Sequence, residues 1–192
     1  MAKKRLIVGI SGASGAPLAV EVLRQLRQHP EIEVHLIVTA GGEMTLTHET
    51  NISLTELCAL ADVYHGIGSI GAAIASGSFK TMGMIVVPCS MKTVAGIASG
   101  YSDNLLLRAA DVCLKERRKL VLAARESPLS TLHLRNLYEV SKLGAMIVPP
   151  VLTYYNHPQS VEDCTYQAVN RILSQFNLDE GRYQWEGFDA AI

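Results

Sequence analysis

The sequence has few aromatic residues, no excess of charge of either sign and no closely spaced cysteines. Phe, Trp and Tyr make up 6% of the 192 residues, whereas apolar residues make up 48%. We therefore expect a core built mostly of Leu, Ile, Val and Ala. The formal net charge of −1 argues against a general nucleic-acid binder, which needs a concentrated basic face. Any anion-binding site is expected to be local.

The four cysteines are scattered along the chain and form no Cys-x-x-Cys pair. This distribution is typical of neither a disulfide framework nor a zinc site. We expect reduced thiols in a cytoplasmic protein, most of them serving to pack the core. They are Cys58, Cys89, Cys113 and Cys164.

Long apolar runs are missing as well. The basic residues Lys3, Lys4 and Arg5, followed by the apolar residues 6–10, imitate the start of a signal peptide. The run is too short for export or for a membrane span, so we interpret it as a buried strand and expect no membrane span.

Short apolar runs rich in branched residues recur along the chain and are continuous rather than alternating. Such runs are typical of parallel strands covered on both faces. We expect strands at residues 6–10, 34–38, 84–87, 120–124 and 145–148.

Helical patterns separate most of these runs. Pro17 lies near the start of the first helix, and Ser160 to Asp163 resembles a capping box that opens the last. The helices are expected at residues 16–28, 104–116, 131–143 and 160 to about 176. The predicted order βαβαβαβαβα gives a single α/β domain over residues 1–192, with residues 177–192 as a C-terminal tail. Its fold class is a flavodoxin-like or Rossmann-like, doubly wound parallel sheet in three αβα layers.

Ligands of such sheets bind beyond the carboxyl ends of the strands. The first strand is followed by G-x-x-G-x-x-G, from Gly9 to Gly15, whose small residues admit ligand oxygens to backbone N–H groups. A tight turn without a ligand is the alternative. The second strand ends at Thr39, without the acidic residue that a nicotinamide enzyme places there. This difference favours a mononucleotide such as FMN over NAD.

Polar and charged residues follow the later strands too. Residues 90–93 place two hydroxyls and an amine at a helix start, and Arg125 with Glu126 ends a buried strand. Arg108 and Lys115 share one helix face. Residues 117–119 are expected to form a solvated helix end. Residues 66–83, rich in Gly, Ala and Ser, fit either a flexible active-site loop or a close-packed connection.

The segment LKERRKLVLAARE, residues 114–126, resembles the signature of the UbiX/Pad1 family of flavin prenyltransferases. Further segments agree in the expected order over nearly the whole chain, namely residues 11–16, 48–50, 75–78, 88–93, 108–111 and 155–163. The resemblance implies metal-independent transfer of a dimethylallyl group from dimethylallyl phosphate to N5 and C6 of reduced FMN, with release of phosphate. It also implies that the prenylated FMN serves a UbiD-type decarboxylase, and that the chain assembles as a homododecamer.

The resemblance carries roles over by position. FMN would be bound by Gly12, Ala13, Ser14, Thr39, Ser90, Met91, Lys92, Thr93 and Arg125. The prenyl phosphate would be bound by Tyr155, Arg171, Lys115 and Arg108. The catalytic residues would be Ser14, Glu49, Lys115 and Glu126. Ser14 and Glu49 would relay protons, Glu126 would tune the phosphate and Lys115, and Trp185 would be the aromatic beside the allylic cation. Some relatives carry another aromatic residue where this chain has only aliphatic residues and glycine at 70–74.

Three other functions are compatible with the same motifs. An FMN-dependent decarboxylase of the cysteine-decarboxylase group would share the fold and oxidise a thiol substrate. A flavin carrier would deliver cofactor without chemistry. A nicotinamide oxidoreductase is weakened by Thr39.

Overall fold

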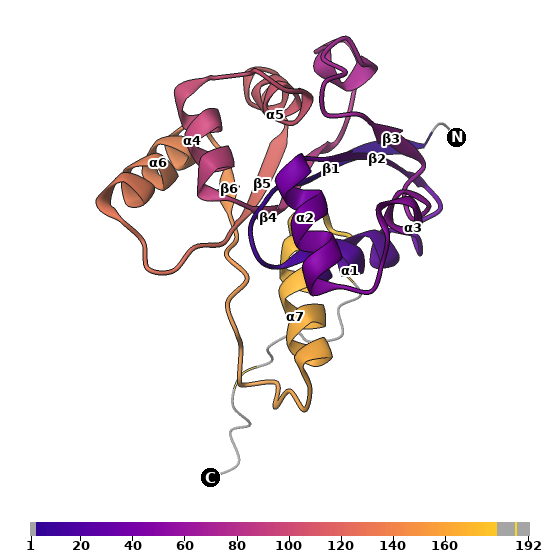
Figure 1. Ribbon diagram of the computed structural model, residues 1–192, viewed down its shortest axis with the longest axis vertical. Helices are drawn as coiled ribbons and strands as arrows, with labels where there is room; N and C mark the ends of the chain where they lie inside the picture. Colours follow the sequence, from indigo (N-terminus) through magenta and orange to yellow (C-terminus); the bar gives the residue numbers. More distant parts are fainter. Residues whose placement is uncertain (1–2, 180–186, 188–192) are drawn as a thin grey trace.

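The computed structural model describes residues 3–179 and residue 187. Its centre is a six-stranded, all-parallel sheet in the order β3-β2-β1-β4-β5-β6 (Figure 1). The strands are β1 Lys4–Ile10, β2 Ile32–Val38, β3 Val63–His65, β4 Gly83–Cys89, β5 Lys119–Ala124 and β6 Met146–Ile147. The order is that of Rossmann-type sheets, and it reverses direction between β1 and β4. A ligand site is therefore expected at the carboxyl ends of these two strands.

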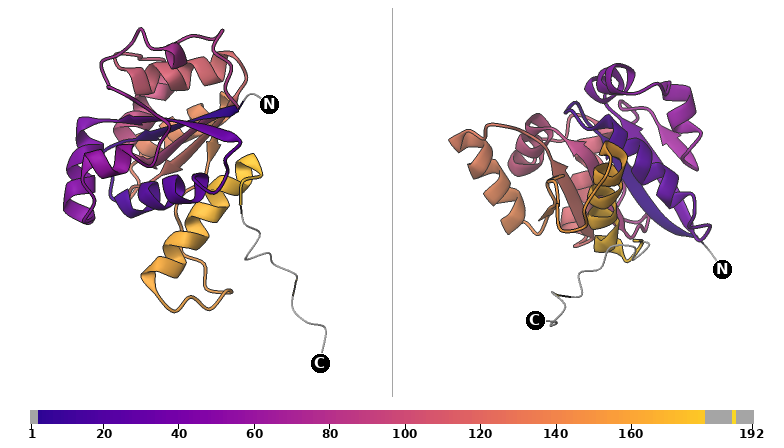
Figure 2. Two further views of the ribbon diagram at one scale, coloured as in Figure 1. Left: turned by 90° about the vertical axis from the view of Figure 1, so that its right-hand side faces the viewer. Right: turned by 90° about the horizontal axis from the view of Figure 1, so that it is seen from below.

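Helices cover both faces of the sheet, which gives the three layers seen in Figure 2. On one face lie α1 (Ala16–Leu26), α3 (Leu54–Cys58) and α7 (Val161–Leu173), and Leu46 of α2 (Ala40–Glu49) joins their core. On the other lie α4 (Met91–Ser99), α5 (Leu105–Lys115), α6 (Thr131–Lys142) and the short η1 (Ala73–Ala75). A second 3-10 turn, η2 (Ser174–Phe176), follows α7.

The five predicted strands and four predicted helices are confirmed, with ends that move by a few residues. The capping box is confirmed too: Ser160 Oγ accepts a hydrogen bond from Asp163 N at 3.0 Å, and Asp163 Oδ2 accepts one from Ser160 N at 3.1 Å. The predicted order is wrong in omitting β3. This strand has only three residues, and Tyr64 within it is 43% exposed, so it produces no continuous apolar run.

Helices α2 and α3 were not predicted as separate elements either. Only Gly42 and Leu46 of α2 are buried, so this helix has no amphipathic pattern to reveal it. Helix α3 has five residues and is opened by a capping box between Ser53 and Glu56.

A long connection between β6 and α7, residues 148–160, extends away from the sheet before the chain returns as α7 (Figure 1). We call it the arm. Its apolar side chains are largely exposed, including Val151 and Tyr154 at 67% and 71%. More exposed apolar side chains lie on α6, at Leu132, Leu134 and Tyr138. Groups of exposed apolar side chains such as these are typical of interaction sites.

The cysteines and the helices agree with the expectations for them. All four cysteines are unpaired, and burial raises the pKa of the Cys113 thiol to about 12. Over the described residues, no helix combines the length and the apolar character needed to cross a membrane.

A chain of polar groups crosses the sheet at β1, β2 and β3. His35 is buried, and its ring nitrogens lie 2.8 Å from Glu33 Oε1 and 2.9 Å from His65 Nε2. Arg5 Nε donates to the same Glu33 oxygen at 3.1 Å. Burial, and after it the neighbouring His35, lowers the pKa of His65. The environment of His65 therefore favours its neutral form.

This lowered pKa predicts a pH-dependent stability. Because the unfolded chain binds a proton at His65 more readily than the folded protein, stability should fall as the pH drops below about 6.5, the ordinary pKa of histidine. His65→Gln keeps a donor for His35 and should make the fall in Tm between pH 7.5 and 5 smaller. His133→Gln, which preserves the cap of α6, is the control and should follow the wild type. Parallel curves for the wild type and His65→Gln would contradict the assignment.

Candidate active site

Three helices begin at the same edge of the sheet. Helices α1, α2 and α4 follow β1, β2 and β4, which are neighbours in the order β2-β1-β4. Thr39 caps α2 by accepting a hydrogen bond from Gly42 N at 3.0 Å. Ser90 caps α4 by accepting one from Thr93 N at 3.3 Å. Since a helix N-terminus carries a partial positive charge and N–H groups without helical acceptors, this edge favours negative groups, either a carboxylate of the chain or a bound anion.

The loops that carry these helix starts are held close together. Ser11 is buried, and its hydroxyl donates to Pro88 O at 3.0 Å and accepts from Ser90 N at 2.8 Å, which ties the loop after β1 to the loop after β4. A Cβ atom on Gly12 would lie 3.0 Å from Gly41 Cα. Glycine is therefore required at Gly12 because the backbone after β2 packs against it, which brings the α1 and α2 loops together.

A cavity of about 830 Å³ opens over this edge. Its near end, which we call the cradle, is lined by Ser11, Gly12, Thr39, Ser90, Lys92 and Thr93. Hydroxyls, helix N–H groups and an amine form a donor set that fits a phosphate group. The side chain of Met91 is buried in the core, so only its backbone can contribute to the cradle.

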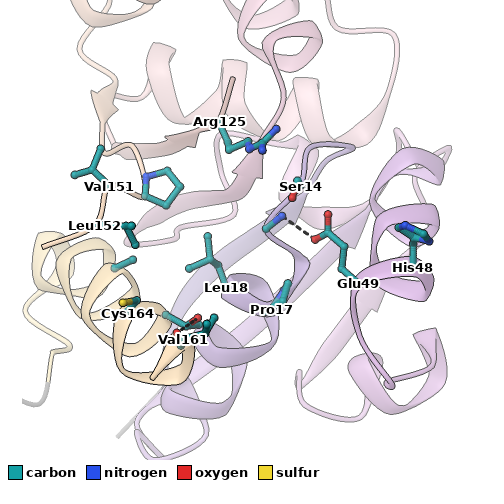
Figure 3. Close-up of a pocket in the computed structure, with 14 residues that line it drawn as sticks. Ser14, Pro17, Leu18, His48, Glu49, Arg125, Val151, Leu152, Val161 and Cys164 are labelled. Atoms are coloured by element: carbon teal, nitrogen blue, oxygen red, sulfur yellow. Dashed lines mark hydrogen bonds between the residues drawn. The ribbon is translucent and has the colours of Figure 1, made fainter. Parts of the chain in front are cut away.

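A second cavity, of about 560 Å³, lies on the other side of the loop after β1. Ser14, Glu49 and Arg125 form its polar end, and they come from the β1–α1 loop, the end of α2 and the end of β5 (Figure 3). The remaining walls are mostly apolar and come from α1, the arm and α7, with Leu18, Val151, Leu152, Val161 and Ala168 among them. This cavity suits an apolar group held next to polar chemistry.

Glu49 is fixed by the start of α1. Its Oε2 atom accepts hydrogen bonds from Gly15 N and Ala16 N, both at 2.8 Å. Partial burial opposes ionisation, but these two bonds, the Ser14 hydroxyl and the charge of Arg125 together outweigh it and lower the pKa of Glu49. At neutral pH the group is therefore a carboxylate that can accept a proton.

The four residues predicted to bind the prenyl phosphate lie away from these two cavities. Lys115 is at the C-terminal end of α5, by the amino ends of the strands, and its Nζ is paired with Glu116 Oε1 at 2.5 Å. Arg108 donates to Ala75 O at 3.2 Å and to Asp111 at 2.5 Å. Arg171 lies near the C-terminal end of α7, and Tyr155 lies on the arm. None of these four lines either of the two cavities above in the described structure.

Three further predicted residues lie at different places in the chain. Glu126 follows β5 directly after Arg125, is exposed, and accepts a hydrogen bond from Ser127 N at 3.0 Å. Ala13 lies in the loop between Gly12 and Ser14. Trp185 lies outside the described residues.

Of the two readings of residues 66–83, close packing holds for residues 77–79, whereas Ile70 is 61% exposed and Gly68 and Gly71 have open space around them. Arg118 donates to Phe79 O at 2.8 Å and to Gly77 O at 2.5 Å. A Cβ atom on Gly77 would collide with the paired Lys115 and Glu116 side chains. The expectation that residues 117–119 form a solvated helix end is therefore wrong for Arg118, which fastens this connection.

The apolar walls of the second cavity escaped the sequence analysis. Leu18 lies on a helix, and Val151 and Leu152 lie in a segment with no strand or helix. Isolated aliphatic residues carry no signal that separates a pocket wall from the core, so only the fold reveals them.

Comparison with known proteins agrees with this geometry. The Flavoprotein family model matches residues 1–175, so the fold and the site define a flavoprotein. The chain belongs to the family of UbiX-like flavin prenyltransferases. It is 52% identical over 187 residues to flavin prenyltransferase UbiX of Escherichia coli K12, which covers 96% of this chain and 99% of that protein.

Two solved structures are close in fold as well. The crystal structure of AnUbiX (PadA1) in complex with FMN and dimethylallyl pyrophosphate has a TM-score of 0.95 and 48% identity, covering 97% of this chain and 100% of that one. The dodecameric FMN-dependent UbiX-like decarboxylase of Escherichia coli O157:H7 has a TM-score of 0.94 and 50% identity, covering 95% and 100%.

The position of Glu49 at the start of α1 predicts an effect on the stability of the fold that requires no ligand. Glu49→Gln removes a charge from the start of α1 and should destabilise the fold at pH 7 by about 1 kcal/mol, or roughly 2–4 °C in Tm. Because the folded pKa is lowered, the contribution of the carboxylate is present above the ordinary pKa and is lost as the pH falls through the folded value. The difference measured by urea unfolding should therefore shrink toward pH 4. Glu21→Gln, which keeps the acceptor for Gln25, is the control, and a loss of equal size there would contradict the assignment.

Proposed function

We propose that the protein is a flavin prenyltransferase that transfers a dimethylallyl group from dimethylallyl phosphate to reduced FMN. The observation that carries this proposal is the junction of two cavities at one loop. A phosphate cradle lies on one side of residues 11–15, and a largely apolar cavity with Glu49, Ser14 and Arg125 at its polar end lies on the other. The residues present fit FMN, with its phosphate in the cradle.

Reduced FMN bound here supplies the electron-rich ring that accepts the dimethylallyl group at N5 and C6. The chain has three tasks: to hold the two reactants together, to stabilise the departing phosphate, and to remove the proton displaced from the ring. The C–O bond of the prenyl donor breaks, and phosphate leaves with the bonding electron pair. Apolar walls such as Leu18 and Leu152 exclude water from the allylic group.

Glu49 and Ser14 remove the proton. The lowered pKa keeps Glu49 ionised, and its hydrogen bond with the Ser14 hydroxyl gives a path from the cavity to the carboxylate. Arg125, whose charge also acts on Glu49, holds the flavin at the same edge.

The phosphate-binding residues require more than one chain. Lys115 lies at the C-terminal end of α5, by the amino ends of the strands, and Arg108 is bonded to Ala75 O and Asp111, whereas Glu49 and Ser14 lie at the carboxyl ends. We propose that the chain assembles as a homododecamer and that neighbouring copies bring Lys115, Arg108, Tyr155 and Arg171 to each site. The related UbiX-like decarboxylase of Escherichia coli O157:H7 is dodecameric, and the exposed apolar side chains of the arm and α6 supply contact surface. Glu126, one residue from Arg125, would then contact Lys115 of a neighbour.

We further propose that the product serves a UbiD-type decarboxylase in the cytoplasm. The four unpaired thiols, two of them buried, suit a reducing compartment.

The activity has a direct test. Under anaerobic conditions the protein, with reduced FMN and dimethylallyl phosphate or its diphosphate, should yield prenylated FMN, detected by mass spectrometry of the released flavin. Glu49→Gln should slow product formation by about 100-fold, a typical contribution of a positioned base, while Glu21→Gln should match the wild type. Recovery of unchanged FMN would contradict the proposal and favour a carrier. Release of carbon dioxide from a cysteinyl acid would favour a decarboxylase.

The shared site has its own test. Glu49→Gln and Lys115→Met should each inactivate a homogeneous assembly. When the two variants are co-expressed in equal amounts, activity should return to about a quarter of wild type, since random mixing gives that share of sites both native residues from different copies. No recovery, with mixed assembly demonstrated by differently tagged chains, would place both residues in one chain.

A further inference from the structure

The cavity that contains the cradle continues well past it. Beyond the start of α4 it runs between α4 and α6, where Arg135, Asn136 and Glu139 line it. Their spacing in α6 puts these three side chains on one helix face. A second charged helix therefore borders the place where the FMN phosphate would lie, and neither the sequence motifs nor the family resemblance assigned it a role.

The carboxylates of this cavity already have partners. Glu139 Oε2 lies 3.2 Å from Lys142 Nζ, although Arg135, four residues earlier, is placed to pair with it. Asp103 Oδ1 accepts a hydrogen bond from Asn104 Nδ2 at 2.9 Å. Neither acid pairs with a cation of the cavity.

The cations that line this cavity, in contrast, lack such partners among the described residues. Lys92 and Arg135 line it and have no hydrogen bond or ion pair with any residue that the structure describes. They come from two helices that pack against each other, α4 and α6. Two unpaired cations on facing helices, beside the hydroxyls of the cradle, leave an excess of positive charge at this end of the cavity.

We infer that Arg135 is a second phosphate-binding residue for FMN, acting together with Lys92. This inference rests on the proposed function, because it takes FMN as the occupant of the cradle. A flavin phosphate carries a charge of about −2 at neutral pH, more than one ammonium group neutralises. The guanidinium fork can donate two parallel hydrogen bonds to phosphate oxygens and so fixes orientation as well as charge. Arg135 thereby selects FMN over riboflavin.

Flavin binding by the assembled apoprotein tests this inference without any turnover. Fluorescence quenching gives Kd values for FMN and for riboflavin, which share the ring and differ in the phosphate. Arg135→Gln should raise the Kd for FMN about tenfold or more and leave that for riboflavin within about twofold, since a charge-assisted bond is lost only with the phosphate. Arg135→Lys should give an intermediate FMN value. Arg24→Gln, which changes a cation on α1 across the sheet from this cavity, should bind both flavins as the wild type does.

Other outcomes would overturn the inference. Unchanged FMN affinity in Arg135→Gln, with a wild type that binds FMN tightly, would reject the role of Arg135 and leave the proposed function intact. Equal weakening of FMN and riboflavin, or a smaller assembly by light scattering, would make Arg135 a structural or intersubunit residue. Absence of flavin binding by the wild type would reject the proposed function itself.

Discussion

The site depends on the parallel direction of three adjacent strands. Because β2, β1 and β4 all end at one edge, the helices that follow them must begin there, and their N-terminal N–H groups gather within one region. Parallel connections force the chain to cross over after every strand, so no local rearrangement can move one helix start away without breaking the sheet. The small residues Gly12 and Gly41 then let the loops approach to contact distance. The concentration of hydrogen-bond donors at this edge therefore follows from the strand topology and not from any single side chain.

Glu49 divides this edge into two environments. By accepting the N–H groups of Gly15 and Ala16 it occupies the start of α1 with a negative charge. A phosphate would be repelled from that helix start and directed to the start of α4, where Lys92 lies. In the proposed complex the flavin ring would then lie toward Ser14 and the apolar cavity. A single intramolecular carboxylate would thus orient a ligand that has a phosphate at one end and a reactive ring at the other.

Most strands and helices could be predicted from the sequence because apolar runs and helix caps are local signals. Residues 6–10 and 120–124 are continuously apolar because both faces of these strands are buried. The capping box of Ser160 and Asp163 marks the start of a helix within four residues. Strand β3 and helix α2 escaped because their stability comes from neighbours that are distant in sequence. The site could be predicted only in part for the same reason. The hydroxyls and glycines of the loops are visible in motifs, whereas the apolar walls and the pairing of Glu139 with Lys142 exist only after folding.

Separating the phosphate cations from the base also has an electrostatic advantage. If Lys115 lay beside Glu49 in one chain, the two would pair with each other; the carboxylate would lose basicity, and the ammonium group would be occupied by the carboxylate instead of by phosphate. In the folded chain Lys115 is instead held by Glu116 and Glu49 by backbone N–H groups, so each keeps its charge with a partner that can be exchanged or shared. In the proposed assembly the opposite charges would meet in one site only where Ser14, the flavin and the donor lie between them. An intersubunit site of this kind would therefore preserve in each chain the charges that the proposed reaction needs.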